Sequence, residues 1–137
     1  MWKYYALLSA FFAALTAILA KVGVKGISGN VATAVRTFIV LILAWLIVLF
    51  SGQLKEVKDL DKTNWIFLIL SGSATGLSWI FYFKALETGD VSKVAPIDKL
   101  SVVFVMMLAF IFLNEPFELK TILGGVLVAT GALLLAL

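Results

Sequence analysis

Five long apolar runs occupy most of this 137-residue chain, and each is about as long as a helix that crosses a membrane. They lie at about residues 4–21, 31–50, 64–86, 91–113 and 121–137. A helix needs roughly 20 mainly apolar residues to span the hydrocarbon core of a bilayer. The runs are continuous, whereas the strands of a membrane barrel alternate between polar and apolar residues. The sequence therefore predicts an all-α integral membrane protein with five transmembrane helices.

The composition excludes several classes of function. Hydrophobic residues make up 63 % of the chain and charged residues 14 %, and the formal net charge is +3. The basic residues are scattered between apolar runs, so they form no surface for nucleic acid. Without histidine or cysteine, the usual general base, the thiol nucleophile and the common transition-metal ligands are missing. We expect no enzymatic activity, no cofactor and no metal ion.

One long polar stretch interrupts the apolar runs. Residues 51–63 read SGQLKEVKDLDKT, which predicts a water-exposed loop, and Trp65 follows at a position suited to an interface anchor. The other connections are short. The chain is therefore expected to form a single domain, residues 1–137, with its two ends on opposite sides of the membrane.

Lysine and arginine are spread almost evenly over the two sides of the membrane. The side of the amino terminus carries five of them: Lys3, Lys55, Lys58, Lys62 and Lys120. The opposite side carries four at its edge and two deeper in the spans: Lys21, Lys25, Lys84, Lys93, Arg36 and Lys99. An excess of these residues normally fixes the cytoplasmic side. The near balance leaves two interpretations open, a single orientation set by the long loop or insertion in both orientations.

Two stretches of the sequence resemble those of a known protein family. Residues 76–100 read GLSWIFYFKALETGDVSKVAPIDKL, and residues 112–135 read FLNEPFELKTILGGVLVATGALLL. In order and spacing they resemble EamA-type proteins of the drug/metabolite transporter superfamily, and the resemblance covers essentially the whole chain as one five-helix unit. Small multidrug resistance transporters are distantly similar.

The resemblance implies an assembly. Most members of the superfamily carry two such units in inverted orientation, and inverted repeats build a binding site near the midplane with alternating access. A single unit would form half of such a structure, so the resemblance implies an antiparallel homodimer in the lipid bilayer. It also implies a multi-pass protein of a bacterial or archaeal plasma (inner) membrane.

Two charged residues fall inside the spans from the same side. Arg36 and Asp98 each lie a few residues into their helices, roughly 8–10 Å deep at about 1.5 Å per residue. Placing a charged side chain at such depth in the hydrocarbon costs free energy, so each charge is expected to have a partner or a function. One interpretation is a structural ion pair between the two. Lys99 points about 100° away from Asp98 on a continuous helix, so we expect it to extend outward or to face the cavity.

The alternative interpretation is a substrate vestibule. Arg36, Lys84, Asp98 and Lys99 would line it with three cations against one anion, which favours a small-molecule substrate that is anionic or zwitterionic. Asp98 is the proton-coupling candidate, because it is the acid that lies well inside the hydrocarbon.

Further candidate positions lie on the third and fourth spans. Trp79 and Tyr82 belong to a polar-tipped aromatic stripe, and the resemblance places this helix beside the substrate cavity. Pro96 removes a helix hydrogen bond near Asp98, which predicts a kink that serves as a hinge or only shapes the helix.

Glycines mark close helix packing on two spans. Gly72 and Gly76 are four residues apart, and Gly124 and Gly131 are seven apart, so each pair lies on one helix face. Packing within one subunit and contact between two copies both fit these pairs.

The sequence thus favours a secondary transporter, an exporter of a small metabolite. The alternative is a non-catalytic membrane partner, such as a flippase subunit for a lipid-linked substrate.

Overall fold

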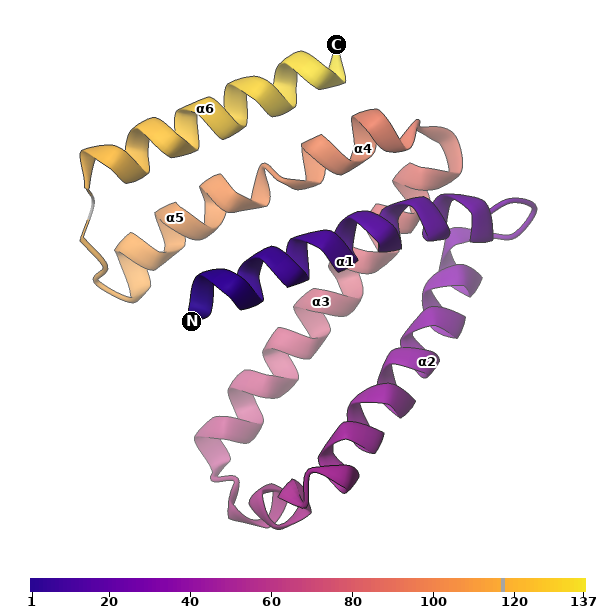
Figure 1. The fold of residues 1–137 in the computed structure, drawn as a ribbon, viewed down its shortest axis with the longest axis vertical. Helices are drawn as coiled ribbons and strands as arrows, with labels where there is room; N and C mark the ends of the chain where they lie inside the picture. The colour runs from indigo at the N-terminus through magenta and orange to yellow at the C-terminus, as the bar shows by residue number, and fades with distance from the viewer. Residues whose placement is uncertain (117) are drawn as a thin grey trace. The chain divides into compact units, whose positions relative to one another are not determined.

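The computed structural model describes residues 1–116 and 118–137, and helices make up nearly all of this part (Figure 1). Their bounds are α1 (Trp2–Gly23), α2 (Gly29–Phe50), the 3₁₀ helix η1 (Gln53–Asp59), α3 (Lys62–Thr88), α4 (Val91–Asp98), α5 (Ser101–Phe112) and α6 (Leu119–Ala136). The described residues contain no strand. Five segments are long and apolar enough to cross a membrane, with α4 and α5 together forming one of them. The prediction of an all-α protein with five spans is confirmed.

The chain forms two compact units. One unit comprises residues 22–87 and contains α2, η1 and most of α3. The other comprises residues 1–21 and 88–137 and contains most of α1 together with α4, α5 and α6.

In the first unit, capping residues mark the starts of α2 and α3, and a glycine follows the end of α2. Ser28 precedes α2, and its hydroxyl accepts a hydrogen bond from the backbone N–H of Val31 at 3.4 Å. After α2, Gly52 takes φ of 69°, a left-handed conformation that suits glycine. The Asp61 carboxylate accepts a hydrogen bond from the Asn64 N–H at 2.7 Å at the start of α3. These caps satisfy amide groups that the helices cannot pair internally.

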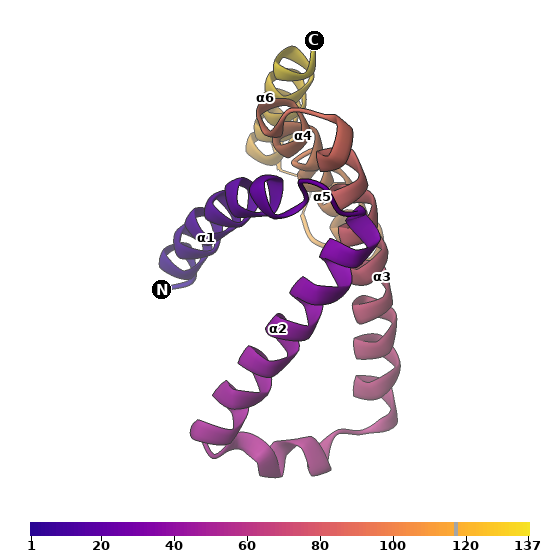
Figure 2. The same cartoon turned by 90° about the vertical axis from the view of Figure 1, so that its right-hand side faces the viewer.

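The two helices touch where α2 begins and diverge toward η1 (Figure 2). A Cβ atom on Gly29 would lie 3.0 Å from the Lys84 nitrogen and 3.0 Å from the Phe83 carbonyl carbon. The Gly29 N–H also donates a hydrogen bond to the Glu87 carboxylate. A side chain at this position would press on two backbone atoms of α3, and its Cβ atom would also lie 2.8 Å from a carboxylate oxygen of Glu87.

In the second unit, α6 runs back along α5 and α4 (Figure 1). Gly125 on α6 is buried, and a Cβ atom there would lie 3.1 Å from the Met106 sulfur of α5. The Lys21 ammonium of α1 donates a hydrogen bond of 2.8 Å to the Gly89 carbonyl, just before α4. The carboxyl end of α1 is thereby tied to the start of the fourth span.

The fourth span is broken, although the sequence predicts one kinked helix over 91–113. α4 ends at Asp98, two residues after Pro96, and α5 begins at Ser101. Between them the Lys99 N–H binds the Pro96 carbonyl at 3.0 Å, and the Leu100 N–H binds the Ile97 carbonyl at 2.9 Å. These i→i+3 bonds make a tight turn. Proline lacks an N–H and removes one hydrogen bond of the turn that precedes it, whereas this break lies in the turn that follows.

The remaining boundaries differ from the expected ones by about two residues at an end, the usual uncertainty of helix termini. The expected loop at 51–63 is wrong in part. It contains η1, and Lys62 already belongs to α3.

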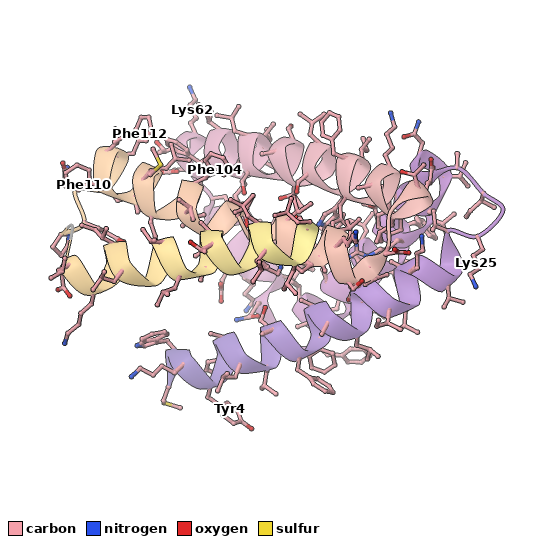
Figure 3. The ribbon with its side chains drawn as sticks, turned by 90° about the horizontal axis from the view of Figure 1, so that it is seen from above. Tyr4, Lys25, Lys62, Phe104, Phe110 and Phe112 are labelled. Carbon is pink, nitrogen blue, oxygen red and sulfur yellow. The ribbon has the colours of Figure 1, made fainter. Side chains whose placement is uncertain are left out.

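Most apolar side chains on the spans are exposed within the described chain. Tyr4 of α1 and Phe110 and Phe112 of α5 project away from the ribbon (Figure 3). Exposed apolar area on this scale is typical of surfaces that contact lipid or another membrane protein.

Candidate functional site

The guanidinium of Arg36 lies over aromatic rings in the unit of residues 22–87. Its central carbon is 4.4 Å from the ring centre of Trp79 and 5.5 Å from that of Phe83. Phe83 is buried, whereas Arg36 and Trp79 are half-buried. A cation held over an aromatic face is attracted by the ring quadrupole, more strongly where water is excluded. The two rings therefore hold a positive charge inside a membrane-spanning segment.

The helices explain how these groups meet. Trp79 and Phe83 are four residues apart on α3 and share one face of that helix. Arg36 lies seven residues after the start of α2, roughly 10 Å along its axis. The contact at Gly29 brings α2 against α3 two helical turns earlier, so the long Arg36 side chain reaches both rings. Tyr82 precedes Phe83 on α3, with 6.4 Å between the centres of the two rings.

This arrangement is suited to binding an anionic group. Arginine carries its five N–H donors around the edge of a planar group, and stacking on a ring occupies a face and leaves the edge accessible. A carboxylate or a phosphate can accept two parallel hydrogen bonds from that edge. The aromatic platform restricts the guanidinium to few orientations, which lowers the entropy cost of binding.

The structure brings two of the predicted substrate-binding residues together, Arg36 and Trp79, and the Tyr82 ring lies against that of Phe83. Lys84 belongs to the same unit, where its side chain is exposed and its backbone borders Gly29. Asp98 and Lys99 belong to the other unit. The proposed ion pair between Arg36 and Asp98 therefore stays a prediction.

Asp98 and Lys99 form an ion pair with each other, with 3.2 Å between the Lys99 nitrogen and the Asp98 oxygen. The expectation that these neighbours diverge is wrong, because it leaves out the length of the lysine side chain. Lys99 still has right-handed helical dihedral angles, with φ of −71° and ψ of −8°, and its ammonium reaches back to the Asp98 carboxylate. The pair is partly exposed, with 57 % of the Lys99 side chain and 36 % of the Asp98 side chain accessible. No group of three or more acidic residues, as a metal ion would need, gathers in the described part of the chain.

The predicted packing glycines face open space within the described chain. A Cβ atom built on Gly72, Gly76, Gly124 or Gly131 would meet no described atom within 4 Å. The glycines that make close contacts are Gly29 and Gly125, which the sequence did not distinguish. A role for the four predicted glycines in contacts between two copies stays a prediction.

Three contributors to the site were missed at the level of sequence. Phe83 could have been found, because it lies one helical turn after Trp79. Gly29 reads as an ordinary turn glycine, and Glu87 as a polar residue near a helix end. Their roles arise from the approach of α2 to α3, which joins residues 58 positions apart.

The five spans define the class, a multi-pass helical membrane protein with a cationic site on an aromatic platform. The chain belongs to the EamA-like transporter family, whose profile matches residues 1–137. The resemblance noted in the sequence is confirmed, and the chain is a membrane transporter by family.

A curated relative is similar over nearly its whole length. It is a protein of Sinorhizobium sp described as an uncharacterized transporter in the cobO 3′ region, 49 % identical over 135 residues, which is 98 % of this chain and 96 % of the relative. No solved structure matches the chain significantly. The spans and the family make this chain a multi-pass integral membrane protein, and the relative comes from a bacterium, which agrees with a location in the inner membrane.

Proposed function

We propose that this protein is a secondary transporter that exports a small anionic or zwitterionic metabolite by alternating access in an antiparallel homodimer. Each copy contributes residues 1–137 as one domain. The observation that carries the proposal is the Arg36 guanidinium, 4.4 Å from the Trp79 ring centre inside a membrane-spanning segment of a transporter-family chain. A charge placed there is costly unless it has a use, and binding a substrate anion is one.

The site residues take distinct roles in this proposal. Arg36 binds the carboxylate or phosphate of the substrate, while Trp79 and Tyr82 contact its body. Lys84 and Lys99 add positive charge around the vestibule. Asp98 is the proton carrier, with the adjacent Lys99 as its partner in the unprotonated state.

The break in the fourth span supplies the moving joint. Pro96 and the turn after Asp98 divide this span into α4 and α5, which are joined by i→i+3 hydrogen bonds in place of the usual α-helical pattern. Alternating access needs a few backbone positions that absorb a change of angle. We assign that role to this joint, with Pro96 as its hinge residue.

Three observations support the antiparallel homodimer. Lysine and arginine are nearly balanced between the two sides, so neither orientation is strongly favoured. The relative aligns over 96 % of its own length and is therefore also about one unit long. The faces of Gly72, Gly76, Gly124 and Gly131 are open within the described chain and would let helices of a second copy approach closely.

The function is tested by uptake into proteoliposomes that contain the purified protein. Solutes with a carboxylate or a phosphate are expected to be transported, and organic cations of similar size are not, because Arg36 would repel them. Cells that overproduce the protein are expected to hold less of the accepted solute, as export requires. Transport of organic cations alone would contradict the proposal.

The assembly is tested by reporters of topology fused after Leu137. One reporter is active only in the cytoplasm and the other only outside it. We expect both fusions to be active to a comparable degree, because the two orientations are about equally populated. Activity of one reporter alone would exclude the antiparallel homodimer and favour a heteromeric partner subunit.

A double variant provides the matched control for that assay. Replacing Gly124 and Gly131 by leucine fills the open face of α6, so both reporters should stay active while cross-linking between copies is lost. The same change at Gly125 would instead press on Met106 within one copy and reduce the folded yield.

A further inference from the structure

The segment between α2 and α3 has a feature that appears only in its observed conformation. Residues 53–59 form a 3₁₀ helix, in which side chains three residues apart are aligned. The sequence QLKEVKD then sorts into three separate stripes. An α-helix would mix these residues, because it advances 100° rather than 120° per residue.

Each stripe has its own chemistry. Leu54 and Val57 form an apolar stripe, which Leu60 extends directly after the helix. Lys55 and Lys58 form a basic stripe. The third stripe contains Gln53, Glu56 and Asp59.

The exposure of the side chains follows the stripes. Val57 and Leu60 are half-buried, and η1 packs against α2. Leu54 remains 47 % exposed, and both lysines are exposed. The apolar stripe is therefore only partly covered by the protein.

The position of η1 indicates which surroundings the uncovered part of its apolar stripe meets. It runs from the end of α2 to the start of α3, both of which span the membrane, and so it lies at the membrane boundary (Figure 2). Aromatic residues flank it on both sides, with Phe50 88 % exposed and Trp65 49 % exposed. The amphipathic ring of tryptophan favours the level of the lipid headgroups.

We propose that η1 is a lipid-headgroup binding segment, which lies in the membrane interface and binds the phosphates of anionic lipids through Lys55 and Lys58. Its apolar stripe faces the acyl chains, and the flexible lysine side chains reach the phosphate level from one flank. Glu56 and Asp59 are on the other flank and face water. Because the three classes of side chain are separated, an equal number of acids and bases along η1 still gives a cationic flank.

This inference does not rest on the proposed transport function. It applies to either orientation in the membrane, because anionic lipids of either leaflet present the same phosphate group.

The orientation of η1 is tested by spin labels in reconstituted vesicles. The chain has no cysteine, so single cysteines can be introduced one at a time at positions 53–60 and labelled. Collision with oxygen, which concentrates in lipid, is expected to peak at 54, 57 and 60. A period of 3.6 residues, or equal access of a water-soluble nickel chelate at every position, would overturn the proposal.

The ligand is tested by the association of spin-labelled phosphatidylglycerol relative to phosphatidylcholine. Lys55→Gln and Lys58→Gln are each expected to lower the relative association roughly fivefold. The matched control, Glu56→Gln with Asp59→Gln, should leave it unchanged or raise it. An equal loss in the control, or no loss in the lysine variants, would overturn the proposal.

Two measurements on the unmodified protein are independent of how the variants fold. Raising the salt concentration should reduce the preference for phosphatidylglycerol, because exposed charges are screened. Inorganic phosphate at millimolar concentration should not displace the lipid. Displacement by inorganic phosphate would show a site for the free ion and overturn the assignment to lipid.

Discussion

Replacing Gly29 by leucine is expected to prevent α2 from packing on α3 and to abolish the folded unit of residues 22–87. A Cβ atom at this position already lies 3.0 Å from two backbone atoms of α3, and backbone cannot move aside as a flexible side chain can. The smaller change Gly29→Ala should lower the free energy of unfolding by about 1–3 kcal/mol, a usual cost of overpacking. Titration with sodium dodecyl sulfate, followed by circular dichroism, measures this free energy.

Gly23→Ala provides the control for the same measurement. Gly23 is the last residue of α1, and no described atom would lie within 4 Å of its Cβ. Alanine there should raise the free energy of unfolding by about 0.4–1 kcal/mol, because it restricts the unfolded chain. If Gly29→Ala were as stable as Gly23→Ala, the close approach of α2 to α3 would be wrong.

Replacing Arg36 by glutamine is expected to raise the substrate concentration for half-maximal uptake by roughly 10- to 100-fold. Hydrogen bonds to a charged group contribute about 1.5–3 kcal/mol, and every 1.4 kcal/mol is a factor of ten in affinity. Arg36→Lys should recover only part of the loss, since lysine keeps the charge but lacks the planar pair of donors. Uptake into proteoliposomes at several concentrations of an accepted anion measures the change.

Two further variants separate binding from coupling in that assay. Lys62→Gln removes an exposed cation at the start of α3, roughly 25 Å along the helix axis from Trp79, and its uptake should match that of the unmodified protein. Asp98→Asn should keep the affinity but lose the dependence of uptake on a proton gradient. Full proton-driven uptake in Asp98→Asn would exclude this residue as the proton carrier. Unchanged affinity in Arg36→Gln would exclude Arg36 as the anion ligand.

The approach of α2 to α3 shows how far local sequence signals reach. The spans themselves follow from hydrophobic length, and Ser28 and Asp61 are ordinary residues for helix starts. Arg36 was recognised as a candidate because a charge in a span is costly. The contact of the Arg36 guanidinium with the rings of Trp79 and Phe83 was not predictable from the sequence. It depends on how Gly29 packs against residues 83–87 of α3.

The fourth span shows the limit of helical periodicity. Pro96 predicts a disturbance in the helix, but the turn follows three residues later, at Lys99 and Leu100. The 100° step separates the Cβ atoms of adjacent residues, but it does not limit how far a long lysine side chain reaches. The ion pair of Asp98 with Lys99 was therefore missed, although the residues are adjacent.

The sequence by itself determined that this chain crosses the membrane five times as helices and resembles the EamA-type transporters. These properties depend on hydrophobic length and on the order of short motifs, which are local along the chain. Only the tertiary structure decided which glycine permits close packing, which rings hold Arg36, and that residues 53–59 form a 3₁₀ helix. These features depend on atoms distant in sequence or on a change in helical period, neither of which a run of apolar residues specifies.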